Sequence, residues 1–545
     1  MTPSKHVDTQ DMTFTGEHTP APTPPAADQP TPGQGRRPHA LAALSGVLSG
    51  AVTLGVASLV SVLFDPASNP VVAVGGAFVD ATPAWLKDLA ISTFGTNDKV
   101  ALFVGMAVVV LVLTAGIGLV AVRRLRVALA LVVALGAVAL AAVLTREGVG
   151  TPDAIPTLVG TVAGMLALRA LVWRVPGAQE PGSPEPGPGS GDRRAFLRAA
   201  VLTTSVAAIA AVGGQLLSAS RRVADTAREM LRLPAPSRAA PALPAGVQSA
   251  APGVVPFATP TEEFYRIDTA LIIPQVDPAT WRLRVYGLVE NVVEITFDEL
   301  LEEDLVEAWV TLACVSNPVG GDLVGNAKWL GLPVRELLAR AKPLPEADMV
   351  LSRSVDGFTA STPLEVLTDD RDALLAVGMN DAPLPLRHGF PVRMVVPGLY
   401  GYVSATKWVT ELKVTTFADD VAYWTPRGWT ERGPIKTASR IDVPRSDAAL
   451  EAGTIPVGGV AWAQHVGVDA VEVQVDDGDW QPATLADEAS TDTWRQWSYA
   501  WEATPGRHTL RVRATDATGE VQTSTEAPPA PDGASGWHEV TVEVD

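Results

Sequence analysis

The chain of 545 residues has little of several residue types on which functional classes depend. It contains one cysteine, Cys314, which excludes an internal disulfide, a cysteine-rich zinc site, an iron–sulfur cluster held by this chain alone and a C-x-x-C-H haem attachment. Basic residues are also scarce, since 41 Lys and Arg face 60 Asp and Glu and the net charge is −19. This balance excludes a basic nucleic-acid binder, and the 47% of hydrophobic residues excludes a disordered chain.

The acidic residues are unevenly distributed and divide the chain in two. Residues 1–217 contain 14 Lys or Arg and 13 Asp or Glu, whereas residues 218–545 contain 27 and 47. The first part carries five long apolar runs, at residues 38–64, 100–122, 127–145, 154–173 and 199–220. Runs of about 20 apolar residues are long enough to cross the roughly 30 Å hydrocarbon core of a bilayer. The sequence therefore predicts five transmembrane helices, and buried core helices are the weaker alternative.

These runs define the organisation expected for the first part of the chain. We expect a disordered cytoplasmic tail over residues 1–38, four transmembrane helices over 39–174 and a cytoplasmic Pro/Gly-rich linker over 175–194. The fifth transmembrane helix is expected over residues 195–220. Of the seven histidines, only His39 touches a run, at its entrance, which excludes a bis-histidine haem there, and no paired acids mark an ion pathway. Anchoring is thus the predicted role, and a transporter with an exterior sensor domain is disfavoured.

Basic residues near the ends of the runs predict the orientation in a cell membrane. Ten arginines on one side face Lys87, Lys99 and Arg146 on the other, which puts the amino terminus inside. Five spans then put the acidic second part on the extracytoplasmic side. The segment DRRAFLR (192–198) before the fifth run resembles a twin-arginine export signal placed internally. Simple positive-inside anchoring by the same arginines is the alternative.

Local patterns in the second part predict an α+β region that begins after a linker. Residues 221–260 are expected to be a linker, because their Pro/Ala-rich portion is typical of a spacer. Residues 281–286 alternate as a strand, and Thr296 is placed to cap the N-terminus of a short helix. Residues 310–313 form a further strand that ends at Cys314, before a Gly/Pro turn. A free cysteine is often inert core filler, so this position alone is weak evidence of function.

The last part of the chain has the pattern of an all-β domain. Alternating segments separated by Gly and Asp turns follow one another from about residue 434. This spacing indicates a β-sandwich. No cysteine pair staples it, so we expect its core, including Trp462, Trp480 and Trp497, to hold it together.

Several short motifs in the second part follow one another in a specific order. They are FYRIDT (264–269), TLACVSN (311–317), GNAKW (325–329), SVDG (354–357), RHGFPVRMVVPG (387–398), YG (400–401) and TKW (406–408). In this order and spacing they resemble the sulfite oxidase-like family of molybdenum–molybdopterin enzymes, in its membrane-anchored bacterial form. The resemblance covers about residues 264–544.

The resemblance implies a fold, a cofactor and a set of site residues. It implies an α+β molybdopterin-binding catalytic domain over residues 261–430 and an immunoglobulin-like dimerisation domain over 431–545, which suggests a homodimer. The implied cofactor is Mo-molybdopterin, with Cys314 as the metal ligand and catalytic residue; a thiolate is a suitable soft ligand for this metal. The implied cofactor-binding residues are Tyr265, Arg266, Asp268, Ser354, Asp356, His388, Arg393, Thr406 and Lys407. Of these, His388, Arg393 and Lys407 match the positions that bind the pterin phosphate.

Departures from the family pattern narrow the expected function. Ile267 stands where sulfite oxidases have an arginine, and Trp429 stands where they have an active-site tyrosine. Loss of these donors weakens the expectation of sulfite as the substrate. No haem domain is present, so we expect a separate electron-transfer partner, either a cytochrome or a quinone-linked protein. The expected protein is a membrane-anchored extracytoplasmic oxidoreductase that catalyses oxo transfer on a small molecule; a cofactor-free binding or assembly module is the alternative.

Overall fold

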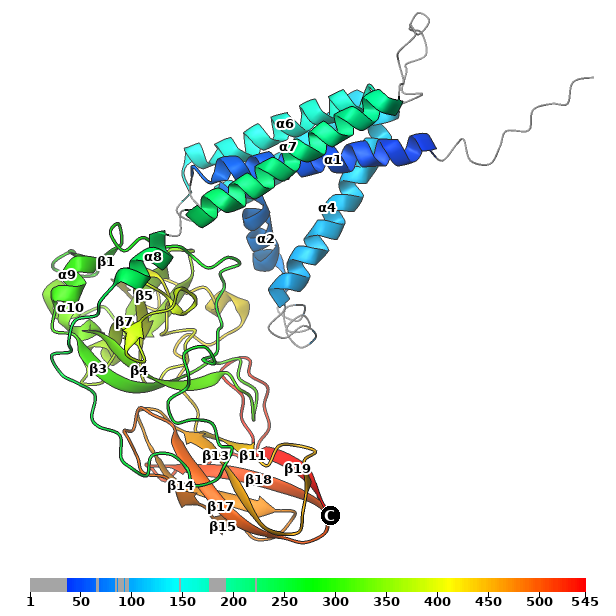
Figure 1. The fold of residues 1–545 in the computed structure, drawn as a ribbon. Coiled ribbons are helices and arrows are strands. Elements are labelled where there is room, and N and C mark those ends of the chain that lie inside the picture. The colour runs from blue at the N-terminus through cyan, green and yellow to red at the C-terminus, as the bar shows by residue number, and fades with distance from the viewer. Residues whose placement is uncertain are drawn as a thin grey trace, which may run out of the picture.

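The computed structural model describes residues 37–64, 68–83, 86, 93, 98–146, 149–175, 193–220 and 223–545. The predicted tail and Pro/Gly linker lie almost wholly outside these residues, as does Lys87. From the amino to the carboxyl end, the described chain forms a group of helices, an α+β domain and a two-sheet β domain (Figure 1).

Four of the five expected spans are long apolar helices. They are α1 (Arg37–Ser61), α4 (Asp98–Arg123), α5 (Leu125–Leu144) and α6 (Ile155–Val172). By length and composition, these four helices could cross a membrane. The fifth expected span also forms a helix, α7 (Arg193–Ser220), but its described apolar part, Leu197–Ile209, is shorter. The sequence did not predict the 12-residue helix α2 (Pro70–Ala81), whose length is below that of a span.

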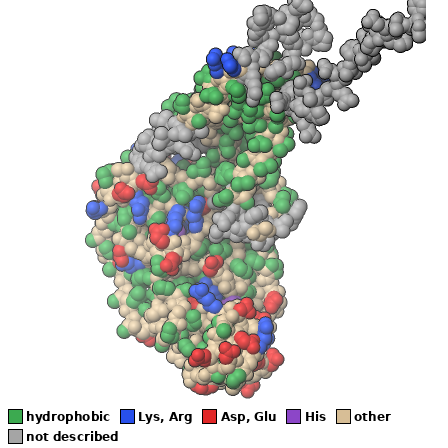
Figure 2. Space-filling model, turned by 45° about the vertical axis from the view of Figure 1, so that its right-hand side comes forward, with side chains coloured by type: hydrophobic (Ala, Val, Ile, Leu, Met, Phe, Trp, Pro, Cys, Tyr) green, Lys and Arg blue, Asp and Glu red, His purple; other side chains and the backbone are tan. Residues whose placement is uncertain are grey.

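Small residues allow the helices to pack closely around α1. Gly46 of α1 and Gly118 of α4 touch so closely that a Cβ on either would overlap the other helix. Gly164 of α6 lies against Thr53, and its carbonyl accepts a hydrogen bond from Ser49 Oγ at 2.9 Å. Such contacts are typical of helix association in membranes. The apolar stretches of α4 and α5 are only 11% and 17% buried, so most of their apolar surface faces outward (Figure 2).

The α+β domain is built on two sheets. One sheet has the strand order β2-β1-β10-β5-β6, and the other has β3-β4-β7-β8 with β9 paired to β7. The strands are β1 (Arg282–Gly287), β2 (Val293–Thr296), β3 (Val306–Ala313), β4 (Val324–Pro333), β5 (Met349–Ser354), β6 (Thr359–Pro363), β7 (Leu374–Met379), β8 (Ala382–Pro383), β9 (Arg393–Val395) and β10 (Val409–Thr415). The helices of this part are α8 (Val223–Met230), α9 (Phe297–Glu302), α10 (Val334–Ala341) and α11 (Leu364–Thr368).

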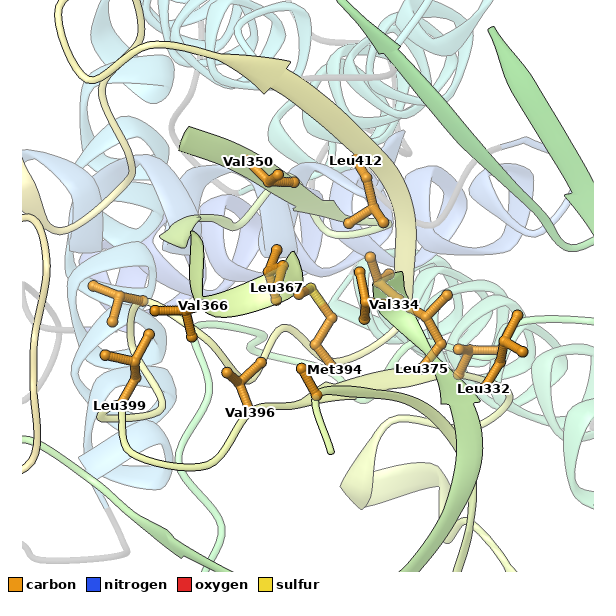
Figure 3. Close-up of a cluster of buried hydrophobic side chains, with 14 of the residues drawn as sticks. Leu332, Val334, Val350, Val366, Leu367, Leu375, Met394, Val396, Leu399 and Leu412 are labelled. Atoms are coloured by element: carbon orange, nitrogen blue, oxygen red, sulfur yellow. The ribbon is translucent and has the colours of Figure 1, made fainter. Parts of the chain in front are cut away.

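Apolar side chains from both sheets meet in one core. Figure 3 shows Val350 and Leu412 from the first sheet, and Leu375 and Met394 from the second, around the same cluster. These side chains are fully buried. The short helices close the core from its edges; Val366 and Leu367 of α11, for example, belong to the same cluster.

The local sequence signals in this domain are confirmed. The strand expected at residues 281–286 is β1, and the strand expected before Cys314 is the end of β3. Thr296 caps α9 through a reciprocal pair of hydrogen bonds with Glu299, at 3.2 Å to Thr296 Oγ1 and 2.8 Å from the Thr296 backbone N–H. Capping and alternation depend on neighbouring residues alone, which is why the sequence reveals them.

The carboxyl-terminal domain contains two sheets with a shared core. One sheet has the order β11-β13-β17-β16 and the other β12-β19-β18-β14-β15. The strands are β11 (Ala438–Val443), β12 (Ala449–Leu450), β13 (Gly453–Trp462), β14 (Val468–Val475), β15 (Gln481–Pro482), β16 (Thr484–Leu485), β17 (Arg495–Ala503), β18 (Gly506–Asp516) and β19 (His538–Val544). Val457 and Trp497 of the first sheet pack with Val471, Val512 and Val542 of the second.

Two of the three tryptophans expected in this core lie elsewhere. Trp497 is fully buried in it. Trp462 is buried instead in the core of the α+β domain, because it stands at the end of β13 that faces that domain. Trp480 is half-buried outside the core, where its ring packs edge-on against Trp537 and under the guanidinium of Arg513. The prediction for these two residues was wrong, because the presence of a tryptophan in the sequence does not show which part of the protein its ring packs against.

Residues 233–260, expected to form a spacer, instead pack along both folded domains. The Ser237 N–H donates to the Leu305 carbonyl at 2.7 Å, and the Ser249 N–H donates to Gln496 Oε1 at 2.6 Å. Phe257 is only 4% exposed, and its carbonyl accepts hydrogen bonds from Asn326 and Trp494 at 2.9 and 3.0 Å. A proline-rich composition limits pairing in a sheet but does not prevent burial. Because residues 233–260 pack along both domains, we call this segment the strap.

The strap predicts that Phe257 stabilises the chain. Phe257→Ala should lower the free energy of unfolding by about 3–5 kcal/mol, because it leaves a cavity between the two domains. Thermal unfolding of the detergent-solubilised protein measures this as a lower melting temperature. The control is Val292→Ala, at a side chain that is 57% exposed. Equal melting temperatures for the two variants would contradict a packed strap.

Candidate functional site

Cys314 lies where β3 ends and a tight loop begins. Its N–H donates to the Leu323 carbonyl at 2.9 Å, and its carbonyl accepts from the Asn317 N–H at 3.1 Å. Asn317 Oδ1 accepts from the Leu323 N–H at 2.8 Å, which closes the loop. The cysteine is 7% exposed. Burial raises the pKa of its thiol, and hydrogen bonds from Ser316 oppose this rise.

His388, Arg393 and Lys407 come together although they are up to 19 positions apart. His388 ends a short 3-10 turn, Arg393 begins β9, and Arg393 pairs with Lys407 through a backbone bridge. Gly389 allows this convergence, because its φ is +110° and a Cβ there would lie 2.9 Å from the Arg393 Cβ. The sequence-predicted phosphate-binding residues thus form one cluster, here called the cationic cradle.

The cationic cradle contains polar groups that the protein does not satisfy fully. His388 Nδ1 is buried and has no hydrogen-bond partner in the described structure, and Nε2 lies 3.3 Å from the Thr261 carbonyl. Among the described residues, the Arg393 guanidinium donates only to the backbone carbonyls of Met394, His388 and Ala405, at 3.3 to 3.4 Å. It also lies over the Trp329 ring, 5.1 Å from the centroid. A buried guanidinium with weak neutral partners fits a site that binds an anion.

Burial dominates the electrostatics of the cationic cradle. It lowers the pKa of His388 to about 3, and the charges of Arg393, Lys407 and Arg387 add to this shift. It lowers the pKa of Lys407 to about 8 and that of Arg393 to about 10, while the carboxylate of Asp268 opposes both shifts. At neutral pH, His388 is therefore uncharged, and the other two side chains carry the positive charge.

The first motif supplies three further predicted residues at the same place. Lys407 Nζ and Arg266 Nε each lie 2.9 Å from Asp268 Oδ2, so this carboxylate bridges two cations. Burial raises the pKa of Tyr265; the charge of Cys314 adds to the rise and that of Arg393 opposes it. The Tyr265 phenol is therefore within electrostatic reach of both the thiol and the cationic cradle.

The three other predicted residues have no hydrogen bond to the cationic cradle among the described contacts. Asp356 Oδ2 accepts from Thr269 Oγ1 at 3.4 Å, which joins the SVDG loop to the end of the first motif. Ser354 is buried at the end of β5, where its Oγ accepts from the Asp356 N–H at 3.4 Å. The Thr406 hydroxyl lies 2.7 Å from Ser352 Oγ in the protein interior. Thr406 therefore contacts the protein interior, whereas its neighbour Lys407 is part of the cationic cradle.

A pocket beside Cys314 includes residues that sequence reasoning did not assign. It is lined by the cysteine loop, by Tyr400, by Thr437 to Ser439 of the β11 region, and by Gln522 and residues 534–536 of the carboxyl-terminal domain. The Gly401 N–H donates to the Ala313 carbonyl at 3.1 Å and holds Tyr400 next to the cysteine. Tyr400 belongs to the YG motif (400–401). The residues from the carboxyl-terminal domain could not be predicted, because no local sequence pattern shows that they lie beside Cys314. Burial raises the pKa of Tyr400 to about 12, so its phenol is protonated at neutral pH.

Comparisons with known proteins agree on one family. The family described as "Oxidoreductase molybdopterin binding domain" matches residues 270–424. Mouse (Mus musculus) mitochondrial sulfite oxidase is 28% identical over 326 residues, which cover 50% of this chain and 59% of that protein. The uncharacterized oxidoreductase YuiH of Bacillus subtilis is 31% identical over 157 residues, which cover 29% of this chain and 76% of that protein.

One solved structure can also be aligned with this chain. The sulfane dehydrogenase SoxCD from Paracoccus pantotrophus aligns with a TM-score of 0.47 and 23% identity, over 54% of this chain and 85% of that one. The chain spans little more than half the length of the mammalian sulfite oxidases that it matches.

The low pKa of His388 predicts a pH dependence of stability. The unfolded chain protonates this histidine below its ordinary pKa of about 6.5, whereas the folded chain keeps it neutral down to about 3. Stability therefore falls as the pH decreases from 7 to 5, by about 2 kcal/mol for this group. His388→Asn should lose less stability over the same interval, as measured by melting temperature at each pH. Parallel curves for variant and wild type would show that His388 titrates normally.

Proposed function

The chain belongs to the sulfite oxidase-like family of molybdopterin-dependent oxidoreductases, and we propose that it is a membrane-anchored enzyme that catalyses oxo transfer on a small molecule with two-electron chemistry at molybdenum. The observation that carries this proposal is the cationic cradle, where His388 Nδ1 has no partner among the described residues, Arg393 is buried, and Lys407 interacts electrostatically with Cys314. Bound Mo-molybdopterin would supply oxo-transfer chemistry between the +6 and +4 states of the metal.

Different residues of the site would bind different parts of this cofactor. Cys314 is the proposed metal ligand, because it is the only thiol in the chain and lies in electrostatic reach of Lys407. His388, Arg393 and Lys407 would bind the terminal phosphate, since they provide one unpartnered imidazole nitrogen and two cationic groups. Asp268 keeps Lys407 and Arg266 in place through its two ion pairs. Tyr265, Ser354, Asp356 and Thr406 complete the proposed contact set.

A cofactor-free binding or assembly module is the competing function. It requires neither a thiol at the end of β3 nor two buried cations beside a histidine whose Nδ1 has no partner in the described residues. Burial of these cations lowers their pKa values and therefore costs folding free energy. A chain without the cofactor would gain nothing from this cost, which favours the enzyme.

We also propose that the α+β domain faces the extracytoplasmic side of a cell membrane. Asp80, at the end of α2, ion-pairs with Arg146 at 2.9 Å and with Arg427 at 3.5 Å, and it accepts a hydrogen bond from the Tyr423 hydroxyl at 2.9 Å. The distribution of basic residues places Arg146 outside, so these contacts support the same side for the domain that carries Tyr423 and Arg427.

The remaining organisation is proposed on the same basis. It comprises five spans with α7 as the fifth, use of the twin-arginine-like segment, the domain boundaries given above, and an immunoglobulin-like carboxyl-terminal domain that forms a homodimer. A separate electron-transfer partner, a cytochrome or a quinone-linked protein, is proposed because the single cysteine cannot hold an iron–sulfur cluster and the sequence has no C-x-x-C-H haem attachment.

Cys314→Ser tests the catalytic assignment. The variant should keep the pterin, which is bound by the cationic cradle, but should lose turnover with redox dyes, because an alkoxide does not replace the soft thiolate. Molybdenum and pterin contents of protein from a cofactor-competent host are measured beside activity. An active Cys314→Ser enzyme would remove Cys314 as the metal ligand. A wild-type protein without molybdenum would favour the binding module.

Sidedness is tested by protease accessibility. In right-side-out spheroplasts, added trypsin should degrade a carboxyl-terminal tag and leave an amino-terminal tag intact, because only the acidic part faces outward. Lysed spheroplasts provide the control, in which both tags are lost. Protection of the carboxyl-terminal tag in intact spheroplasts would reverse the proposed orientation.

A further inference from the structure

Four side chains meet where the helices contact the α+β domain. They are Asp80 near the end of α2, Arg146 two residues after α5, and Tyr423 and Arg427 of the α+β domain; together they are here called the polar junction. Asp80 Oδ2 lies 2.9 Å from Arg146, and Asp80 Oδ1 lies 3.5 Å from Arg427 and 2.9 Å from the Tyr423 hydroxyl. Among the described residues, two guanidinium groups thus share one carboxylate, and the polar junction has excess positive charge.

Helix α2 holds the polar junction together. It lies between α4 and the α+β domain (Figure 1), since a Cβ at Gly75 would touch both Met106 of α4, at 3.4 Å, and Leu271 of that domain, at 3.0 Å. The next residue, Gly76, leaves room for Arg146, because a Cβ there would lie 2.8 Å from Arg146 Nη1. The guanidinium of Arg146 therefore packs against α2, next to the carboxylate of Asp80.

The two arginines have more hydrogen-bond donors than the described residues accept. Each guanidinium carries five N–H groups, and Nε of both Arg146 and Arg427 is buried without a hydrogen-bond partner in the described structure. Arg427 donates to the Tyr423 carbonyl, and its Cζ lies over the Tyr423 ring, 3.7 Å from the centroid. Both arginine side chains are 25% exposed, so a ligand can reach them. Excess positive charge with unused donors suits an anion with several oxygens, such as a phosphate group.

The position of Arg146 indicates where such a phosphate comes from. Arg146 follows Leu144, the last residue of α5, and this helix by length and composition could cross a membrane. In the proposed membrane-anchored arrangement, a residue two positions beyond the helix lies at the level of the lipid headgroups. The shared contact with Asp80 places Arg427 at the same level. The phosphate within reach is therefore that of a phospholipid in the outer leaflet.

The loop that carries Arg427 has side chains typical of a membrane interface. Val421 is 61% exposed, and the half-buried Trp424 packs edge-on against Tyr423 with the ring centroids 5.1 Å apart. Phe78, in the same helix turn as Asp80, is also exposed. Tyrosine and tryptophan are enriched where membrane and water meet, and exposed apolar side chains suit contact with acyl chains. A free phosphate ion would make no use of these groups.

We propose that the polar junction binds the phosphate of an anionic phospholipid, with Arg146 and Arg427 as the donors. The inference rests on the proposed membrane anchoring and adds a lipid site that holds the α+β domain against the bilayer. Phosphatidylglycerol is a suitable ligand, because its phosphodiester is its only charged group. Phosphatidylcholine carries a cationic headgroup as well, which the two arginines repel.

The first test compares lipids on the full chain in a mild detergent. Native mass spectrometry counts the phosphatidylglycerol or phosphatidylcholine molecules retained per chain at equal lipid concentrations, with and without inorganic phosphate. We expect at least one more phosphatidylglycerol than phosphatidylcholine to be retained, and inorganic phosphate at the same concentration should not displace it. Equal retention of the two lipids, or displacement by inorganic phosphate, overturns the lipid site.

The second test assigns the retained lipid to the polar junction. Arg146→Gln and Arg427→Gln should each weaken its binding at least tenfold, the effect of one charge-assisted hydrogen bond, so that one phosphatidylglycerol fewer is retained. Arg511→Gln is the matched control, because Arg511 is similarly exposed, at 27%, and pairs with Glu539 in the carboxyl-terminal domain. Retention equal to wild type in both junction variants, or equal loss in the control, overturns the inference.

Asp80→Asn separates lipid binding from a purely structural ion-pair network. This variant removes the carboxylate but keeps both cations, so it should retain at least as much phosphatidylglycerol as the wild type. A loss as large as that in Arg146→Gln would show that the arginines serve only to pair with Asp80, which overturns the inference.

Failure of this inference is distinguishable from failure of the proposed function. Carbonate extraction of membranes and the molybdenum content are measured on the same preparations. A chain that stays in the membrane and contains molybdenum, but loses no lipid in the junction variants, contradicts the lipid site alone. A chain released by carbonate removes the proposed anchoring and with it the lipid site.

Discussion

The burial of Arg393 and Lys407 is the constraint on which the site depends. Both cations lie in the protein interior, and together they face one buried carboxylate, Asp268. Buried charge is unfavourable unless it is compensated, and the carbonyl contacts of Arg393 are long. The anionic group of the proposed cofactor would complete the compensation. Other features of the site serve the same burial. Gly389 adopts a left-handed backbone conformation beside Arg393, and the Trp329 ring lies beneath the Arg393 guanidinium.

Around this charged centre, the two domains divide the chemistry. The α+β domain carries the cationic cradle and the thiol, both at ends of strands in one sheet. The carboxyl-terminal domain adds the neutral wall that contains Gln522. The strap with Phe257 contacts both domains, so it fixes the geometry of the pocket between them. Charge is thus concentrated in the cationic cradle, whereas no charged side chain of the described residues lines the pocket beside Cys314.

The helices connect to this arrangement through a small polar junction. Asp80, at the end of α2, contacts Tyr423 and Arg427 of the α+β domain and also pairs with Arg146, which follows α5. Figure 1 shows the helices lying to one side of the two folded domains. The outward apolar surface of α4 and α5 suits contact with lipid, whereas α1 is 44% buried and contacts α4, α6 and α7. In the proposed membrane-anchored arrangement, apolar surface would hold the chain in the bilayer, and a few charges would orient the α+β domain.

The sequence alone determined the features that depend on local order. Long uncharged runs indicated the helices, alternation and capping indicated β1 and α9, and ordered motifs indicated the family and the residues of the cationic cradle. Only the tertiary structure decided which distant surfaces meet. In the tertiary structure, Trp462 packs in the core of the α+β domain, and the expected spacer packs along both domains. Gln522 and Cys314 line the same pocket. These outcomes depend on packing between residues far apart in sequence, which leaves no periodic or compositional trace.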